Sequence, residues 1–209
     1  MKTSRVVNLK EIRFFDFAKK NKIIILLCIL FAIGVGLGTF SLNKSNIVNA
    51  MSENYLNSYI QKRTDTSFLS VMFSSAISSF LIMLISFVFG ASLMGIVTVP
   101  LLICWCGFEY GCVSALLYSQ YALKGVAFNA IILIPSSVVF LISLLFASRE
   151  SIAFSLVISK LTLPKSRPTN IYMDFKNYCG RYIFLSFLII VSALINSILT
   201  SSFMKFFDF

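Results

Sequence analysis

The chain has 209 residues, of which 58% are hydrophobic and 12% are charged, against about 25% charged residues in an ordinary soluble domain. This composition excludes a water-soluble globular protein and predicts one compact membrane domain. The net charge of +10 comes from basic residues between the apolar runs, where they meet anionic lipid head groups, so it does not predict nucleic-acid binding.

The N-terminal segment 1–22 is basic, and its apolar residues recur at helical spacing. This pattern predicts an amphipathic helix on an anionic membrane surface, with a cleaved signal peptide as the alternative. The next run, Ile23–Leu42, is long for a signal peptide and no A-x-A site follows it, so we expect a retained first span. The polar segment 43–67 predicts a second interfacial helix, which would anchor the chain or dock a partner.

Two pairs of glycines stand four residues apart, Gly34 with Gly38 and Gly107 with Gly111. Each pair forms the G-x-x-x-G pattern that lets a second membrane helix approach closely. We therefore predict that the two bare grooves pack on each other, either within one chain or across a homo-oligomer. The alternative is that glycine is simply common in membrane helices.

The apolar run from Phe68 to Tyr118 is too long for one span, since about 20 residues cross the hydrocarbon core. The small residues Gly90–Ser92 predict a tight turn that divides it into a helical hairpin. Pro100 removes a backbone hydrogen bond in the second arm and predicts a kink there.

A short connection, residues 119–124, leads to a further span that contains Pro135. Pro135 is the second predicted kink, and the hydroxyls of Ser136 and Ser137 are expected to bond the carbonyls that it frees. A proline with polar neighbours also occurs along substrate paths in transporters, which is the alternative.

The second basic segment, residues 149–181, begins with an amphipathic stretch, Ile152–Leu163, predicted to lie in the membrane interface, and helix is expected to resume near Asn170. The predicted fold is all-α: a polytopic membrane helix bundle of about five transmembrane helices with short interfacial helices. The predicted spans are Ile23–Leu42, Phe68–Phe89, Leu93–Tyr118, Gly125–Ala147 and Tyr182–Met204.

The distribution of basic residues predicts the orientation. With five crossings, 13 of the 18 Lys and Arg residues fall on one side of the membrane and five on the other. The positive-inside rule then places the N-terminus and segment 149–181 in the cytoplasm and the C-terminus outside the cell membrane.

Glu109 is the one acidic residue within the apolar stretch 68–146. A carboxylate in hydrocarbon is unfavourable, so we expect a buried polar contact with neighbouring helices. A proton relay or a polar contact that gates a path is the alternative.

The sequence predicts no catalytic, cofactor or metal site. It contains no histidine, which excludes histidine-based triads and zinc sites, and its serines have no identifiable base. The five cysteines form no C-x-x-C pair and read as small buried apolar residues; they are Cys28, Cys104, Cys106, Cys112 and Cys179.

Several stretches together resemble the stage II sporulation protein M family. They are the glycine-rich run from Phe31 to Gly38, the Gly-Phe-Glu-Tyr-Gly stretch at 107–111, and Ile132-Leu-Ile-Pro135, followed by Arg149 and Glu150. Family members often carry Pro-His-Gly and then Glu in the fourth span. Here Pro135-Ser136-Ser137 replaces that motif, so no role is transferred to those polar residues.

The resemblance implies a non-catalytic scaffold in a membrane complex that acts with a peptidoglycan hydrolase during engulfment in sporulation. The expected partners are the lipid bilayer, other membrane or cell-wall proteins, and a second copy of the chain. The competing hypothesis is a transporter or permease component, with a path near Glu109, Pro100 and Pro135.

Overall fold

A computed structural model describes residues 22–42, 54, 68–161 and 171–203, and these ranges are almost entirely helical. The elements are α2 (Lys22–Leu42), α4 (Phe68–Gly90), α5 (Gly95–Phe128), the π-helical turn η1 (Asn129–Leu133), α6 (Ile134–Leu161) and α7 (Ile171–Phe203). The predicted all-α membrane bundle is confirmed. The interfacial helices predicted in segments 1–22 and 43–67 fall, apart from Lys22 and Asn54, outside the described residues.

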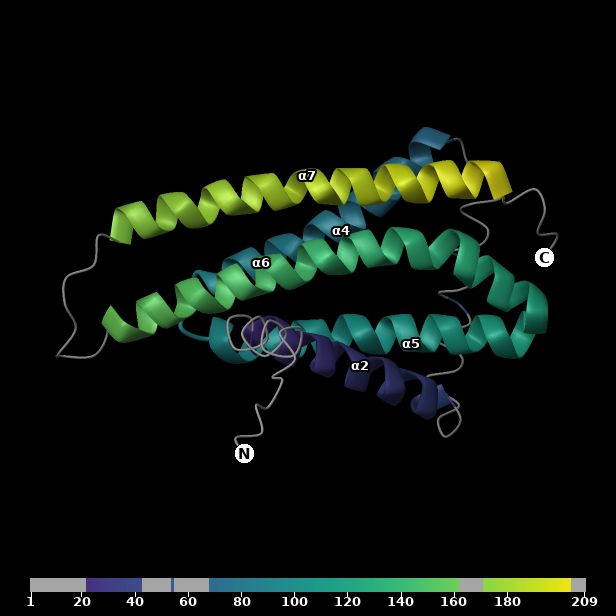
Figure 1. Cartoon of the computed structure of the whole chain (residues 1–209), viewed down its shortest axis with the longest axis horizontal. Helices are drawn as coiled ribbons and strands as arrows, with labels where there is room; N and C mark the ends of the chain where they lie inside the picture. The colour runs from purple at the N-terminus through teal and green to yellow at the C-terminus, as the bar shows by residue number, and fades with distance from the viewer. Residues whose placement is uncertain (1–21, 43–53, 55–67, 162–170, 204–209) are drawn as a thin grey trace, which may run out of the picture.

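Four segments of the described chain are long and apolar enough to cross a membrane, against the five spans predicted. The difference arises in the third segment, Gly95–Lys160, which has 66 residues. Figure 1 shows that this segment turns back on itself, so that α5 and α6 run side by side in opposite directions. The sequence predicted two separate spans in this region, Leu93–Tyr118 and Gly125–Ala147, because a loop was expected between them.

The predicted connection at 119–124 is instead helical, except at one residue. Ala122 has φ 45° and ψ −123°, and it holds the one positive φ of a non-glycine residue in the described chain. Helical backbone continues on both sides of Ala122, so the chain reverses without a conventional loop. We call the region 118–133 the hairpin end of the molecule.

The two predicted kinks behave differently. Pro100 lies inside α5, whose non-helical φ and ψ occur at Ala122, so the backbone departs from helix there and not at Pro100. Pro135 is the second residue of α6, which begins where η1 ends, and a π-helical turn is a recognised way for a helix to absorb a local distortion. The hydroxyl of Ser136 donates to the carbonyls of Leu133 at 3.1 Å and Ile132 at 3.4 Å, which lie three and four residues before it. The predicted bond from a serine hydroxyl to the carbonyl that Pro135 frees stays a prediction.

The structure agrees with one predicted helix boundary in the second half of the chain and differs from another. Helix was expected to resume near Asn170, and α7 begins at Ile171, whereas the span expected to end at Ala147 continues unbroken as α6 to Leu161. Ile152 and Phe154, predicted to lie in the interface, are buried within the bundle. The reason is that this part of α6 lies between two neighbours: Phe154 packs with residues of α7, and Ile152 packs with residues of α2 and α5 (Figure 1).

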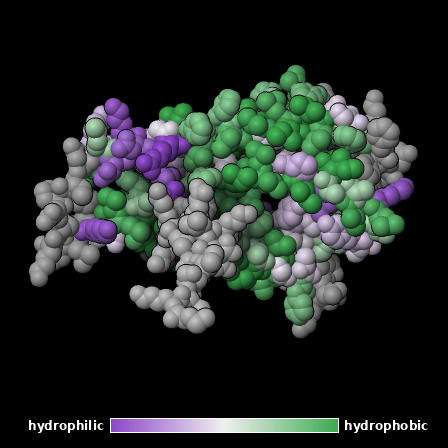
Figure 2. Space-filling view, in the orientation of Figure 1, coloured by the Kyte–Doolittle hydropathy of each residue, from purple (hydrophilic) through white to green (hydrophobic). Residues whose placement is uncertain are grey.

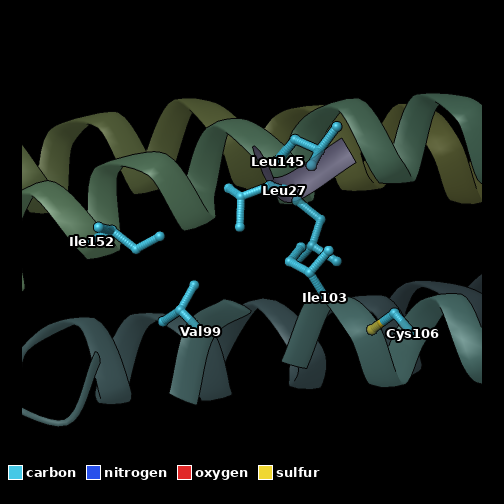
Figure 3. Close-up of a cluster of buried hydrophobic side chains, with 7 residues drawn as sticks. Leu27, Val99, Ile103, Cys106, Leu145 and Ile152 are labelled. Carbon is cyan, nitrogen blue, oxygen red and sulfur yellow. The ribbon is translucent and has the colours of Figure 1, made fainter. Parts of the chain in front are cut away.

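The core consists of layers on either side of α6. On one side α7 packs on α4 and α6, and on the other α5 packs on α6 and also carries α2 (Figure 1). Figure 3 shows the buried cluster formed by Leu145 and Ile152 of α6 with Val99 and Ile103 of α5, and Leu27 of α2 lies between these helices.

The surface of the described chain is broadly apolar, as a membrane-embedded bundle requires. Figure 2 shows a wide hydrophobic surface, with hydrophilic side chains gathered toward the end where α7 begins. The ion pair between Glu150 of α6 and Arg181 of α7 lies in this part of the molecule, as does the turn at 91–94 that follows α4. We call it the charged end.

Candidate functional site

The glycine grooves of α2 and α5 face each other within one chain. A methyl group on Gly34 or Gly38 would overlap the carbonyl oxygen of Cys104 or Phe108, respectively. A methyl group on Gly107 or Gly111 would overlap the carbonyl oxygen of Phe31 or Val35. The two helix backbones are therefore in direct contact.

A third glycine on α2 shows that the arrangement is specific to one face. Gly36 lies between Gly34 and Gly38 in the chain, yet a Cβ atom at this position would meet nothing within 4 Å. Cys112 of α5 adds a weak contact from its Sγ to the carbonyl of Gly38, at 3.5 Å. Because the grooves pair within the chain, they are not available for a contact between two copies.

Glu109 lies on the opposite side of α5 from the glycine groove, and it is exposed. The expectation of a buried contact with other helices is therefore wrong for this chain. The reason is helix geometry: each residue turns about 100°, so a residue two positions from Gly107 points to the opposite face. The indole Nε1 of Trp105 donates a hydrogen bond to Oε1 of Glu109 at 3.0 Å, and Trp105 itself is 60% exposed.

A buried cluster of hydroxyl groups joins α4, α6 and α7 near the charged end, and we call it the serine–tyrosine cluster. It consists of Ser86, Ser151, Tyr178 and Tyr182, all buried. Ser151 Oγ lies 3.0 Å from the carbonyl oxygen of Ser86 and 3.1 Å from the hydroxyl of Tyr178, and it also contacts the hydroxyl of Tyr182. One serine of α6 thus ties together two neighbouring helices.

The two tyrosines also hold the backbone of the helices around them. Tyr178 donates to the carbonyl of Phe87 at 2.9 Å, and Tyr182 donates to the carbonyl of Ala147 at 3.2 Å. The ring of Tyr178 stacks on Phe154 and Phe87, with centroids 4.7 Å and 5.0 Å apart. Sequence reasoning missed this cluster, although the spacing of four between Tyr178 and Tyr182 places both on one helix face.

A second set of polar contacts, centred on Asn129, lies at the hairpin end. Asn129 of η1 is 1% exposed, and its Nδ2 donates to the hydroxyl of Tyr118 at 2.5 Å. The hydroxyl of Tyr110 donates to Oδ1 of the same asparagine at 3.3 Å. One buried amide therefore links the π-helical turn to two levels of α5.

Further hydrogen bonds run along α7 toward its C-terminal half. Ser143 donates to the carbonyl of Leu185 at 3.0 Å, and Ser192 donates to the carbonyl of Ser136 at 2.8 Å. Asn196 donates to the hydroxyl of Ser75 of α4 at 2.6 Å. Small polar side chains therefore connect α7 to α4 and α6 at several depths, as is common between membrane helices.

The chemistry of these groups suits adhesion between helices. Across the described ranges, no three histidine, cysteine, aspartate or glutamate side chains come together in a way that could hold a metal ion. The cysteines described are free thiols. The hydroxyls of the serine–tyrosine cluster bond to one another and to backbone carbonyls.

Comparison with known proteins gives one match. The model of the family described as Stage II sporulation protein M matches residues 27–201. The match covers every described helix from within α2 to the last turns of α7. No curated protein and no solved structure matches the chain.

Proposed function

Because this chain belongs to the stage II sporulation protein M family, we propose that it is a non-catalytic membrane scaffold that assembles other proteins into a complex during sporulation. The multi-pass apolar bundle is the part of this proposal that family and fold already share. The scaffold role, the absence of catalysis and the partners are the parts to be tested. The partner that the family resemblance favours is a peptidoglycan hydrolase acting in engulfment.

One observation carries the scaffold proposal: the acidic side chain within the apolar region faces away from the bundle. A transport path near Glu109 would require this carboxylate to line an interior space, whereas Glu109 is exposed on the outer face of α5. The interior is mostly apolar, and its polar side chains include serine, tyrosine and asparagine residues bonded across helices. An outward polar group on a well-connected bundle favours contact with another protein.

We also propose that the third segment crosses the membrane twice, giving five crossings. The helical arms before and after Ala122 each exceed the roughly 20 residues that a crossing needs. With the charged end in the cytoplasm, Arg149, Lys160, Lys176 and Arg181 lie on the inner side, as the positive-inside rule favours.

The scaffold role is tested by purification of the tagged full-length chain from sporulating cells in mild detergent, followed by mass spectrometry. We expect a cell-wall hydrolase or a membrane partner to co-purify in a stable ratio. Gly34→Leu forces α2 away from α5 and should reduce recovery of the complex. Gly36→Leu is its matched control and should leave recovery unchanged. Purification of the chain alone from sporulating membranes would contradict the proposal.

The orientation is tested by labelling intact cells with a membrane-impermeant thiol reagent. The chain used has its five native cysteines replaced by serine and one cysteine introduced at position 57 or at position 165. We expect labelling at 57 and protection at 165 until the membrane is opened. The reverse pattern would overturn the proposed topology.

A further inference from the structure

The depth of Glu109 is the starting point. This residue lies near the middle of the α5 arm between Gly95 and Ala122, about 20 Å from each end at 1.5 Å per residue. A bilayer core is about 30 Å thick, so the middle of the arm lies well inside the hydrocarbon in any placement that embeds both ends near the surfaces. Glu109 is therefore an exposed carboxyl group at membrane depth.

The described residues around Glu109 satisfy its carboxyl group only in part. Trp105 supplies one hydrogen bond, to Oε1, and this is the hydrogen bond that the described chain offers to the carboxyl group. The one ion pair among the described residues is Arg181 with Glu150, at the charged end. A carboxyl group that faces lipid in this way has an unfavourable free energy, and acidic residues within spans almost always pair with a partner.

The other residues of the helix face that carries Glu109 are exposed and apolar. Val97 and Leu101 are each 69% exposed, and together with Trp105 and Glu109 they follow a spacing of four along α5. Residues four apart lie on one side of a helix, so these four side chains form a stripe. We call it the Trp105–Glu109 face.

Charge complementarity decides which occupant fits this face. A second copy of the chain, related by an axis along the membrane normal, would bring its own Glu109 to the same depth and place like groups together. The basic residues of the described helices are Lys22, Lys124, Arg149, Lys160, Lys176 and Arg181, none of which lies at the level of Glu109 on the α5 arm. The described helices of a second copy therefore do not supply the missing cation.

We propose that the Trp105–Glu109 face binds a transmembrane helix of a different membrane protein, one that carries a lysine or arginine at mid-membrane depth. The inference rests on the proposed function, because it names the chemistry of one partner in the proposed complex. The basic side chain pairs with Glu109, and the apolar part of the partner helix covers Val97, Leu101 and the ring of Trp105.

The test is photo-crosslinking in the native membrane with the full-length chain. A photoreactive amino acid replaces Leu101 in the test chain and Ile183 of α7, a similarly exposed position at 73%, in the control chain. We expect a protein adduct from position 101 and at most lipid adducts from position 183. Mass spectrometry of the adduct should place the linked peptide in a partner span that contains Lys or Arg.

Charge variants then separate the ion pair from simple packing. Glu109→Lys should reduce the adduct from position 101 by at least about tenfold, the loss that one unpaired buried charge produces. Exchanging the partner's basic residue for glutamate in the same cell should restore it. Thr98→Lys places a charge at a half-buried position closer to the end of α5 and should reduce the adduct much less.

Each result has one consequence. An adduct only with a second copy of this chain, only with lipid, or with a span lacking a basic residue would overturn the inference. If tagged wild-type chain still co-purifies with its partners in any of these cases, the scaffold proposal stands and only this contact is wrong. If nothing co-purifies, both fail.

Discussion

Two helix contacts in this bundle use opposite means. Between α2 and α5 the contact depends on side chains that are absent, since four glycines let the backbones touch. Between α4, α6 and α7 it depends on side chains that are present, since the hydroxyl groups of the serine–tyrosine cluster join the three helices. The first contact is intolerant of added volume, and the second is intolerant of lost polar atoms.

The difference has a physical origin in the membrane. The lipid is as apolar as the helix surfaces, so burial alone gives no reason for two particular helices to meet. Close backbone packing and hydrogen bonds are the two remaining sources of specificity. This protein uses one on each side of α6, and the following substitutions separate them.

The largest expected effect comes from adding volume to the glycine contact. Gly34→Ala should lower the free energy of unfolding in detergent by about 1–3 kcal/mol, because the new methyl group meets the backbone carbonyl of Cys104 and neither helix can yield locally. Thermal unfolding followed by the fluorescence of Trp105 measures the change.

Gly36→Ala is the matched control on the same helix. Its new methyl group has open space, and alanine favours helix by about 1 kcal/mol over glycine, so stability should stay the same or rise slightly. Equal destabilisation by the two substitutions would mean that α2 does not pack through this face.

Removing one hydroxyl from the serine–tyrosine cluster should have the next largest effect. Ser151→Ala leaves the hydroxyls of Tyr178 and Tyr182 without their shared partner, which should lower stability by about 1–2 kcal/mol. Ser78→Ala serves as the control, since the Ser78 hydroxyl is exposed and bonds its own helix at Ser74. Similar unfolding midpoints for the two variants would contradict a structural role for the cluster.

A third substitution introduces a glycine at a position where the backbone favours one. Ala122 holds a positive φ that glycine adopts more readily, so Ala122→Gly should stabilise the protein by about 1 kcal/mol. Ala127→Gly, in the regular helix of the same arm, should instead destabilise it by about 0.5–1 kcal/mol. Chemical unfolding in mixed micelles checks the two signs, and destabilisation by both would argue against the reversal at Ala122.

The smallest effect is expected at the ion pair of the charged end. Arg181 is 63% exposed and Glu150 is 17% exposed at the side chain, so solvent and salt screen their attraction. A double-mutant cycle with Arg181→Gln and Glu150→Gln should give a coupling of about 0.2–1 kcal/mol that declines with added salt. A larger, salt-independent coupling would place this pair among the main contacts of the bundle.

The sequence predicted some contacts because their signal is local. The spacing of Gly34 with Gly38 and of Gly107 with Gly111 marks one face of each helix, and the structure places those faces together. The turn after Gly90 was visible in its small residues, and it lies at residues 91–94. The serine–tyrosine cluster was missed because the hydrogen bonds between its members join residues 27 to 96 positions apart, and serine is abundant in every span.

The prediction for Glu109 failed for a related reason. A sequence shows that an acid lies within an apolar run, but the side of the helix that meets protein depends on which neighbour packs there. In this chain α2 occupies the side of Gly107 and Gly111, which leaves Glu109 facing outward.

The sequence alone determined that the protein is an apolar helical membrane bundle, because the length of an apolar run and the sparsity of charge are properties of the chain itself. Tertiary structure decided where the long third segment reverses, which helices share hydroxyl groups, and that Glu109 lies outside. Those outcomes depend on which helix faces meet, and the periodicity of one segment can mark a face without identifying the distant segment that packs on it.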